Sequence, residues 1–313
     1  MRRLDNNYKS FKESIVDCIS KIPFTEKMYV PQGICFVDGY YFLTMYDSSR
    51  IRNSIICMFY DNKFIKKVYL DNKAHCGGIS YDYETDSIFI SDSGYKNHSY
   101  VKKIAVDDLV TAENNSIVNI KARFEVDKDN SLYSSSAKHS SVSYLNCFSG
   151  CLFVGNYTSH IDSGKAFIKI YKILDNGNLS KSYEIIKNPF CNVQGLCVFK
   201  YKSKILYLFS RSFGRKRNSL IHICEFYKGD FYIVSTMVLP SMLEQVSVSG
   251  NNLVLIFESC AKIFRKTALT VNDGIYLLDL EKVVNTFDNY SDFCKGTSFF
   301  VFNSKYKFWW FIL

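Results

Sequence analysis

Short runs in which apolar and polar residues alternate recur along the chain from Pro31 onward. Such alternation over a few residues predicts half-buried β-strands. Five of the runs share a start of polar or small residues followed by apolar alternation, and they begin at Gln32, Gly77, Ser140, Gln194 and Glu244. The starts lie roughly 45 to 63 residues apart, a period that matches a four-stranded blade of a β-propeller better than a helical repeat.

Each run is followed by turn-forming residues and by a second apolar strand that ends in a polar residue. These last residues are Asp47, Asp92, Asn156, Arg211 and Glu258. If the first residue of each run faces the last residue of its partner, the hairpin midpoints fall at or beside turn-like sequences such as Asp38-Gly39. The pattern therefore predicts five equivalent hairpins.

Two further strands are visible in several repeats, for example at 54–60 and 64–70. We therefore expect an all-β fold, a five-bladed β-propeller; a six-bladed ring is the alternative, because the second and last repeats are long. The fifth repeat has its third strand at 274–280. Its fourth strand must come from the C-terminus or from residues before Pro31. The aromatic tail 299–313 is expected to be a closing strand, a flap or an attachment site.

Residues 4–22 carry apolar side chains at spacings of three and four, which predict an amphipathic helix that ends at Pro23. Such a helix can lie on a membrane or dock on the body of its own domain, and we expect docking. The expected organisation is a helical segment at 1–30 followed by a single propeller domain at 31–313.

Composition agrees with a strand-rich globular protein. Hydrophobic residues make up 47% and charged residues 22% of the 313 residues, so the chain can bury a core. Aromatic residues reach 16%, an excess that favours strands. The formal net charge of +9 is spread along the chain except for the run 211–217, which indicates a phosphate-binding or a solvated loop. No helix-turn-helix or finger spacing accompanies the charge, so sequence-specific nucleic-acid binding is not expected.

The remaining composition bears on the compartment. Eleven cysteines occur as a scattered, odd-numbered set with no CxxC pair, which argues against a disulfide framework and suits a reducing environment. The first residues contain no apolar signal core, and no apolar run is long enough for a transmembrane helix. We expect a cytoplasmic protein; the oligomeric state does not follow from the sequence.

A set of polar residues is expected to meet at one face of the ring, because in each blade the innermost strand begins where the second strand ends. The four carboxylates Glu244, Glu258, Asp47 and Asp92 are candidates for acid–base catalysis, with His75 as a proton shuttle. The candidate substrate-binding residues are Gln32, Gln194, Asn156, Arg211, His139 and His160. The competing interpretation is structural, because a wet channel needs a polar lining.

No resident cofactor is expected. The carboxylates could hold Ca²⁺, and His75 would favour Zn²⁺ or another transition metal, but no short ligand spacing supports either ion. The nucleophile elbow Gly-x-Ser-x-Gly, the Walker loop and the dinucleotide-binding glycine fingerprint are absent. Cys76 is the one cysteine placed to act as a nucleophile.

The motifs at Pro31-Gln-Gly-Ile, His75-Cys-Gly-Gly-Ile and Val193-Gln-Gly-Leu resemble those of a group of uncharacterised bacterial β-propeller proteins, over most of 30–280. More remotely, Gln32-Gly-Ile and Gln194-Gly-Leu are similar to the Gln-Gly-Leu strand of plant-type glutaminyl cyclases, which are five-bladed propellers. That resemblance implies a chemistry centred on the pore, with Gln32 lining the pocket. The chain lacks the glutamate turn and the pocket tryptophans of that family.

The sequence supports two classes of function. One is an enzyme that acts at the pore on a small amine- or carboxylate-bearing molecule or a peptide end, by acyl transfer, cyclisation or hydrolysis. The other is a non-catalytic module that binds a peptide, a glycan or a protein partner.

Overall fold

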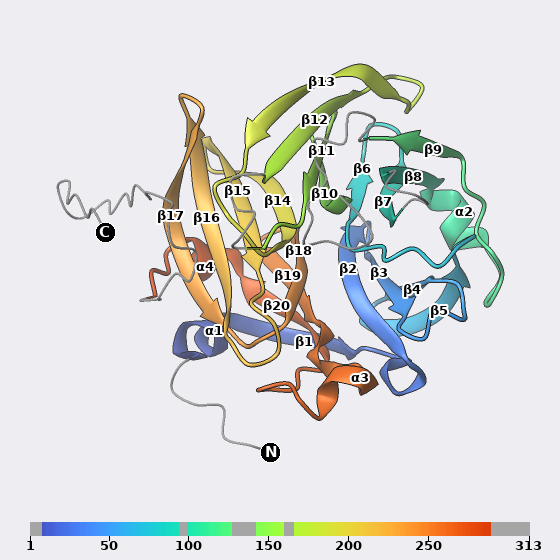
Figure 1. Cartoon of the computed structure of the whole chain (residues 1–313), viewed down its shortest axis with the longest axis horizontal. Helices are drawn as coiled ribbons and strands as arrows, with labels where there is room; N and C mark the ends of the chain where they lie inside the picture. The colour runs from blue at the N-terminus through green and yellow to red at the C-terminus, as the bar shows by residue number, and fades with distance from the viewer. Residues whose placement is uncertain (1–7, 94–98, 127–141, 160–165, 289–313) are drawn as a thin grey trace.

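The structure is a computed structural model that describes residues 8–93, 99–126, 142–159 and 166–288. In it, five antiparallel sheets of four strands surround a common centre (Figure 1). The first blade contains β2 (Tyr29–Val37), β3 (Tyr40–Asp47), β4 (Ile55–Tyr60) and β5 (Lys63–Tyr69). The second contains β6 (Ile79–Asp82), β7 (Ser87–Ser93), β8 (Ser99–Ala105) and β9 (Ala122–Glu125).

The remaining blades follow the same order. The third contains β10 (Val142–Phe148), β11 (Cys151–Asn156), β12 (Phe167–Ile173) and β13 (Leu179–Lys187). The fourth contains β14 (Val193–Tyr201), β15 (Lys204–Arg211), β16 (Ser219–Tyr227) and β17 (Asp230–Leu239). The fifth contains β18 (Leu243–Ser249), β19 (Asn252–Phe257), β20 (Gly274–Asp279) and β1 (Ile15–Lys21). The five-bladed prediction is confirmed.

The ring is closed by its innermost strands, since β2, β6, β10, β14 and β18 contact one another in that order and β18 contacts β2 again. Each predicted hairpin is present. In the first, Asp38 and Gly39 both have positive φ, 45° and 87°, which is the backbone of a type I′ turn and matches the twist of the two strands. The strands expected at 54–60 and 64–70 are β4 and β5.

The N-terminal segment differs from the expected helix. Helix α1 spans only Lys9–Ser14, and the chain continues as β1, which pairs antiparallel with β20. The β-branched pair Ile15-Val16 favours a strand over a helix, and the edge of β20 offers unpaired backbone groups. The fourth strand of the last blade therefore comes from residues before Pro31, one of the two sources that we expected. The tail 299–313 lies outside the described residues.

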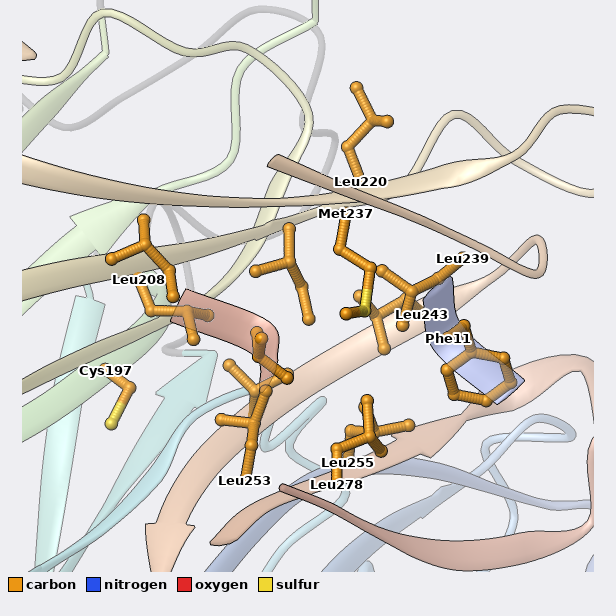
Figure 2. Close-up of a cluster of buried hydrophobic side chains, with 14 of the residues drawn as sticks. Phe11, Cys197, Leu208, Leu220, Met237, Leu239, Leu243, Leu253, Leu255 and Leu278 are labelled. Atoms are coloured by element: carbon orange, nitrogen blue, oxygen red, sulfur yellow. The ribbon is translucent and has the colours of Figure 1, made fainter. Parts of the chain in front are cut away.

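The core lies between blades, which explains why the second strand of each hairpin is almost continuously apolar. Along β19, Leu253, Leu255 and Phe257 belong to one buried cluster, shared with the fourth blade. Val254 and Ile256 point the other way, into a cluster shared with the first blade. A strand buried on both faces needs apolar residues at successive positions. Figure 2 shows the first of these clusters, with Phe11 of α1 packed beside Leu239, Leu243 and Leu255.

Helices are few and short. Those in the described part of the chain are α1, α2 (Val106–Thr111), α3 (Lys262–Arg265) and α4 (Leu280–Val284), with short 3₁₀ turns η2 (Thr25–Lys27) and η4 (Glu258–Cys260). Among the described residues, no helix is both long and apolar enough to cross a membrane. Of the cysteines in the described ranges, nine are free. Cys191 is disulfide-bonded, an exception to the expectation from the scattered cysteines.

Candidate functional site

Polar residues of the repeated motif lie at β-bulges in the innermost strands. In β2, Pro31 faces Met45 and Gly33 faces Thr44, so that Gln32 is the extra residue. The same shift occurs at Ser143 in β10, at Gln194 in β14 and within Glu244-Gln245 in β18. A bulge breaks the strict alternation of a strand and re-aims a side chain. The bulges thus explain how strands that are otherwise apolar can direct a polar side chain away from the apolar core.

Two of these strand ends bring a pair of glutamates together. Glu244 lies near the start of β18, and Glu258 directly follows β19, where its backbone N–H donates to the Met242 carbonyl over 3.0 Å. The two carboxyl groups are hydrogen-bonded to each other. Glu244 is buried, with 2% of its surface exposed, whereas Glu258 is partly exposed. Glu258 is therefore the member of the pair that faces solvent.

Burial raises the pKa values of both glutamates, and it does so by different amounts. Burial and the neighbouring charge of Glu258 raise the pKa of Glu244 well above its usual range. Burial also raises the pKa of Glu258, to about 7, although hydrogen bonding to Gln32 and Glu244 and the positive charge of Arg215 act in the opposite direction. The pair therefore keeps a proton to higher pH than a free carboxyl group would, and Glu244, the more deeply buried member, holds it more tightly.

Both motif glutamines contact this pair. The Gln32 side chain hydrogen-bonds Glu258, and the Gln194 amide lies 3.4 Å from a carboxyl oxygen of Glu244. Gln32 also donates to its neighbouring carbonyl, that of Pro31, over 2.8 Å. These amides come from the first and fourth blades, so three blades contribute to the arrangement. We call Glu244, Glu258, Gln32 and Gln194 the glutamate site.

Two tyrosines lie within electrostatic reach of the glutamate site. Burial raises the pKa of Tyr46 and of Tyr157, and both glutamates raise each further, so both phenols stay protonated. The Tyr157 oxygen accepts a hydrogen bond from the Asn192 amide over 3.1 Å. Its backbone N–H donates to Ser143 Oγ, the bulge residue of β10, over 3.0 Å. Tyr157 is therefore held at both ends.

The centre of the ring is crossed by the side chain of Gln245. Its amide accepts from the Ile79 N–H over 2.8 Å and donates to the Ile79 carbonyl over 2.6 Å, which joins the fifth blade to the second. The glycines after the motif polar residues make this close approach possible. A Cβ on Gly33 would lie 2.7 Å from Gln245 Oε1, and a Cβ on Gly195 would lie 2.8 Å from Gln245 Cα.

The other two candidate carboxylates, Asp47 and Asp92, interact with groups outside the glutamate site. Asp47 accepts from the backbone N–H groups of Ser49 and Arg52 and from the Ser49 hydroxyl, and so closes the turn after β3. Burial opposes ionisation of Asp47, but these hydrogen bonds lower its pKa overall. Asp92 is held by Asn72 at 2.9 Å, Arg123 at 3.2 Å and Lys102 at 3.5 Å. Neither carboxylate joins the glutamate site.

Arg211 and Asn156 bind groups of their own blades. The Arg211 side chain is fully buried, donates to the Cys191 carbonyl over 3.0 Å, and lies 3.0 Å from the ring of His222. Burial and Arg211 lower the pKa of His222 well below its usual range, so this histidine is neutral. Asn156 accepts from the Phe167 N–H over 3.1 Å. Both residues stabilise connections between strands, and the structure does not place them beside the glutamates.

The structure places one of the three candidate histidines and the candidate cysteine Cys76. His75 is exposed and packs edge-on against Tyr46, with ring centroids 4.5 Å apart. His139 and His160 lie outside the described residues. Cys76 is buried, and burial raises the pKa of its thiol to about 12, which disfavours a thiolate nucleophile. Within the described ranges, no three His, Cys, Asp or Glu side chains are grouped so as to hold a metal ion.

The sequence did not single out Tyr46, Tyr157, Asn192 or Gln245 as site residues, and it indicated Arg215 only as part of the basic run 211–217. A signal was available for two of them, because Tyr46 immediately precedes Asp47 and Tyr157 immediately follows Asn156 at the strand ends. Gln245 follows the motif residue Glu244 in the one motif that carries two long polar side chains in succession. The basic run indicated the charge of Arg215, but its position beside the glutamates depends on contacts between loops, which leave no local pattern.

Together, the sheets and the polar strand ends define a five-bladed β-propeller with a pair of glutamates, one buried and one partly exposed, at one end of its ring. Neither a protein-family model nor a curated protein matches the sequence. Solved structures match the fold. A glutaminyl cyclase from Myxococcus xanthus is 9% identical with a TM-score of 0.49, and the match covers 81% of this chain and 92% of that chain.

Two further matches are of the same order. An α-L-arabinofuranosidase from Clostridium thermocellum is 10% identical with a TM-score of 0.47, over 75% of this chain and 83% of that one. The endosialidase of phage phi92 is 8% identical with a TM-score of 0.48, over 87% of this chain and 60% of that one. The Gln-Gly motifs find no match at the level of sequence. Similarities this low assign no activity to the chain.

Proposed function

We propose that the chain is an enzyme in which Glu258 acts as a general base on a carbonyl compound, in a hydrolysis, cyclisation or acyl-transfer reaction. The observation that carries the proposal is the hydrogen-bonded glutamate pair, whose partly exposed member, Glu258, has a pKa raised by burial to about 7. A base works best when its pKa lies close to the operating pH, because it is then both ionised and sufficiently basic. A pair kept only for stability would be costly to bury.

Each residue of the proposed site has a distinct part in the reaction. Glu258 takes the proton of the attacking water or amine as its oxygen or nitrogen bonds to the carbonyl carbon. Tyr46 and Tyr157, both protonated, donate hydrogen bonds to the developing oxyanion. When the bond to the leaving group breaks, Glu258 returns the proton to that group. Glu244 keeps its own proton and orients Glu258 by hydrogen bonding.

The closeness of the two glutamates also disfavours one chemistry. Glycosidases of the common two-carboxylate type place the sugar between two carboxyl groups that lie about 5 Å apart or more. Glu244 and Glu258 are in direct hydrogen-bonding contact instead, which leaves no room for a glycosidic bond between them. A shared proton suits a reaction at a carbonyl group better.

The test uses fluorogenic aminoacyl amides of 7-amino-4-methylcoumarin and esters of 4-methylumbelliferone as probes. We expect turnover by the native protein between pH 6 and 8, and a loss of at least about 100-fold in kcat for Glu258→Gln. The matched control is Glu281→Gln, which changes an exposed glutamate of α4 and should retain full activity.

Two results would overturn the proposal. One is undiminished turnover by Glu258→Gln. The other is no turnover of any amide or ester by the native protein, which would favour the alternative class, a non-catalytic binding module.

A further inference from the structure

Arg215 lies in the loop that joins β15 to β16, beside the short segment that follows Glu258. In that segment the Glu258 carbonyl accepts from the Ala261 N–H over 3.0 Å, and the Ala261 carbonyl accepts from the Phe264 N–H over 2.9 Å. The positive charge of Arg215 also acts to lower the pKa of Glu258. Arg215 is exposed to solvent, yet it is held in place. Its carbonyl accepts from the Leu269 N–H over 2.8 Å, and one of its guanidinium nitrogens lies 3.4 Å from Thr267 Oγ1. The guanidinium also lies over the ring of Phe264, 4.7 Å from its centroid.

These contacts come from α3 and the residues that follow it, so that a segment of the fifth blade fixes an arginine of the fourth. An exposed arginine ordinarily loses rotamer freedom when it binds a ligand, and that loss weakens binding. Stacking on Phe264 restricts the Arg215 side chain before any ligand binds, so that less conformational entropy is lost on binding. The guanidinium of Arg215 is therefore pre-organised while its donors stay accessible.

The charge around Arg215 favours an anion. Within the described ranges, no carboxylate lies at ion-pair distance from Arg215, whereas Arg265 of the neighbouring α3 is paired with Glu26. The loop 212–218 contains Arg215, Lys216 and Arg217 and no acidic residue. A cluster of one sign of charge raises the local concentration of oppositely charged ligands.

We propose that the substrate carries a carboxylate, and that Arg215 binds this carboxylate while the reacting carbonyl lies at Glu258. The inference rests on the proposed function of the glutamate site and narrows it to one class of substrate. A guanidinium binds a carboxylate through two parallel hydrogen bonds. A monoanionic carboxylate suits the position better than a phosphate dianion, because the ionised form of Glu258 repels the larger charge more strongly.

The test measures binding without turnover, so that its outcome is separate from that of the activity assay. The probes are N-acetylglycine, its neutral analogue N-acetylglycinamide, and inorganic phosphate, each titrated into the full chain and followed by NMR chemical-shift changes. We expect N-acetylglycine to bind more tightly than the other two probes. Arg215→Gln should weaken its binding at least tenfold, whereas the matched control Lys216→Gln, in the same loop, should weaken it less than twofold.

Each contrary outcome is specific. Equal binding of the neutral amide would overturn the carboxylate requirement, and tighter binding of phosphate would assign the arginine to a different anion. Equal weakening by Lys216→Gln would show a diffuse positive field in place of a site at Arg215, and absence of binding would overturn the inference outright. Arg215→Gln is expected to fold, because the substituted side chain is exposed, and its unfolding midpoint is measured alongside.

Discussion

Glu258 illustrates how much of its behaviour a residue owes to its neighbours. A carboxyl group at the end of a strand ordinarily ionises well below neutral pH. Burial raises the pKa of Glu258 to about 7, against the lowering effects of Gln32, Arg215 and Glu244. Asp47, at the equivalent strand end of the first blade, has its pKa lowered by three hydrogen bonds from its own turn. Equivalent positions in the repeat therefore carry opposite chemistry.

The raised pKa of Glu258 predicts a dependence of stability on pH. Because the folded state holds the proton more tightly than the unfolded chain, the free energy of unfolding falls as pH rises from about 4.5 to about 7. Glu258→Gln removes this titration, so the variant should be more stable than the native protein at pH 8, by roughly 3 kcal/mol. The advantage should shrink at pH 5. Urea unfolding of both proteins at the two pH values measures it.

The comparison with Glu281→Gln controls for the loss of a negative charge from a chain that is already basic. Neutral His222 opposes stability on the acid side, but it is present in all three proteins and cancels in the differences. If Glu258→Gln gains the same stability at pH 5 as at pH 8, Glu258 does not titrate near neutral pH.

At the residue scale, the sequence predicted the positions of the candidate site residues better than the side chains with which they interact. The strand-end pattern indicated Glu244 and Glu258 because hairpin geometry alone determines which residues share a face of the ring. It could not separate them from Asp92, because the ion pairs of Asp92 with Arg123 and Lys102 join strands whose side-chain contacts are set only on folding. Arg211 was selected for its charge, but its burial beside His222 has no signature in the local sequence.

At the scale of elements, the hairpins were predictable and the first element was only partly so. A hairpin such as β2–β3 is specified by alternation and by a turn within fewer than twenty residues. The strand β1 depends on β20, which lies about 250 residues further along the chain. The helical spacing of the N-terminal residues correctly predicted a helix as far as Ser14. From Ile15 onward, pairing with the distant edge of β20 makes the chain a strand.

Helix α1 fastens this closing strand to the ring. Phe11 is 2% exposed and contacts Phe257 and Tyr276 edge-on, at centroid distances of 6.1 and 6.0 Å. Phe11→Ala should lower the free energy of unfolding by about 3 to 5 kcal/mol, because it leaves a cavity between α1 and the fifth blade. The control Val16→Ala, in β1 at 59% exposure, should change it by less than about 0.5 kcal/mol. Equal effects in urea unfolding would show that α1 does not contribute to closure.

At the scale of the whole molecule, Gln245 connects blades that are not neighbours in the ring. Its two hydrogen bonds to Ile79 satisfy both backbone groups of a buried residue in the second blade. Gln245→Leu keeps the size of the side chain and leaves these two groups without their partner. Each buried, unsatisfied group costs about 1 to 3 kcal/mol, so the variant should lose at least about 2 kcal/mol of stability.

Hydrogen exchange provides a second measurement of the same substitution. In Gln245→Leu, the amide of Ile79 should exchange much faster than in the native protein, whereas amides of β16, in the fourth blade, should change only as global stability changes. The matched control is Ser247→Ala, in the same strand, which should leave the exchange of Ile79 as it is. An unchanged Ile79 amide in Gln245→Leu would contradict the bridge across the centre.

The pairing of β1 with β20 has a consequence for the time at which the ring closes during synthesis. The strand β1 leaves the ribosome before any residue of the first blade, but its partner is translated about 250 residues later. At roughly 5 to 20 residues per second, the interval lasts tens of seconds. Throughout it, Phe11, Ile19 and Ile22 have no fifth blade to cover them, while four blades can already assemble. Of the whole chain, the N-terminal segment is thus the part whose apolar side chains wait longest for their partner strand during synthesis, and it is most at risk of wrong contacts in that time.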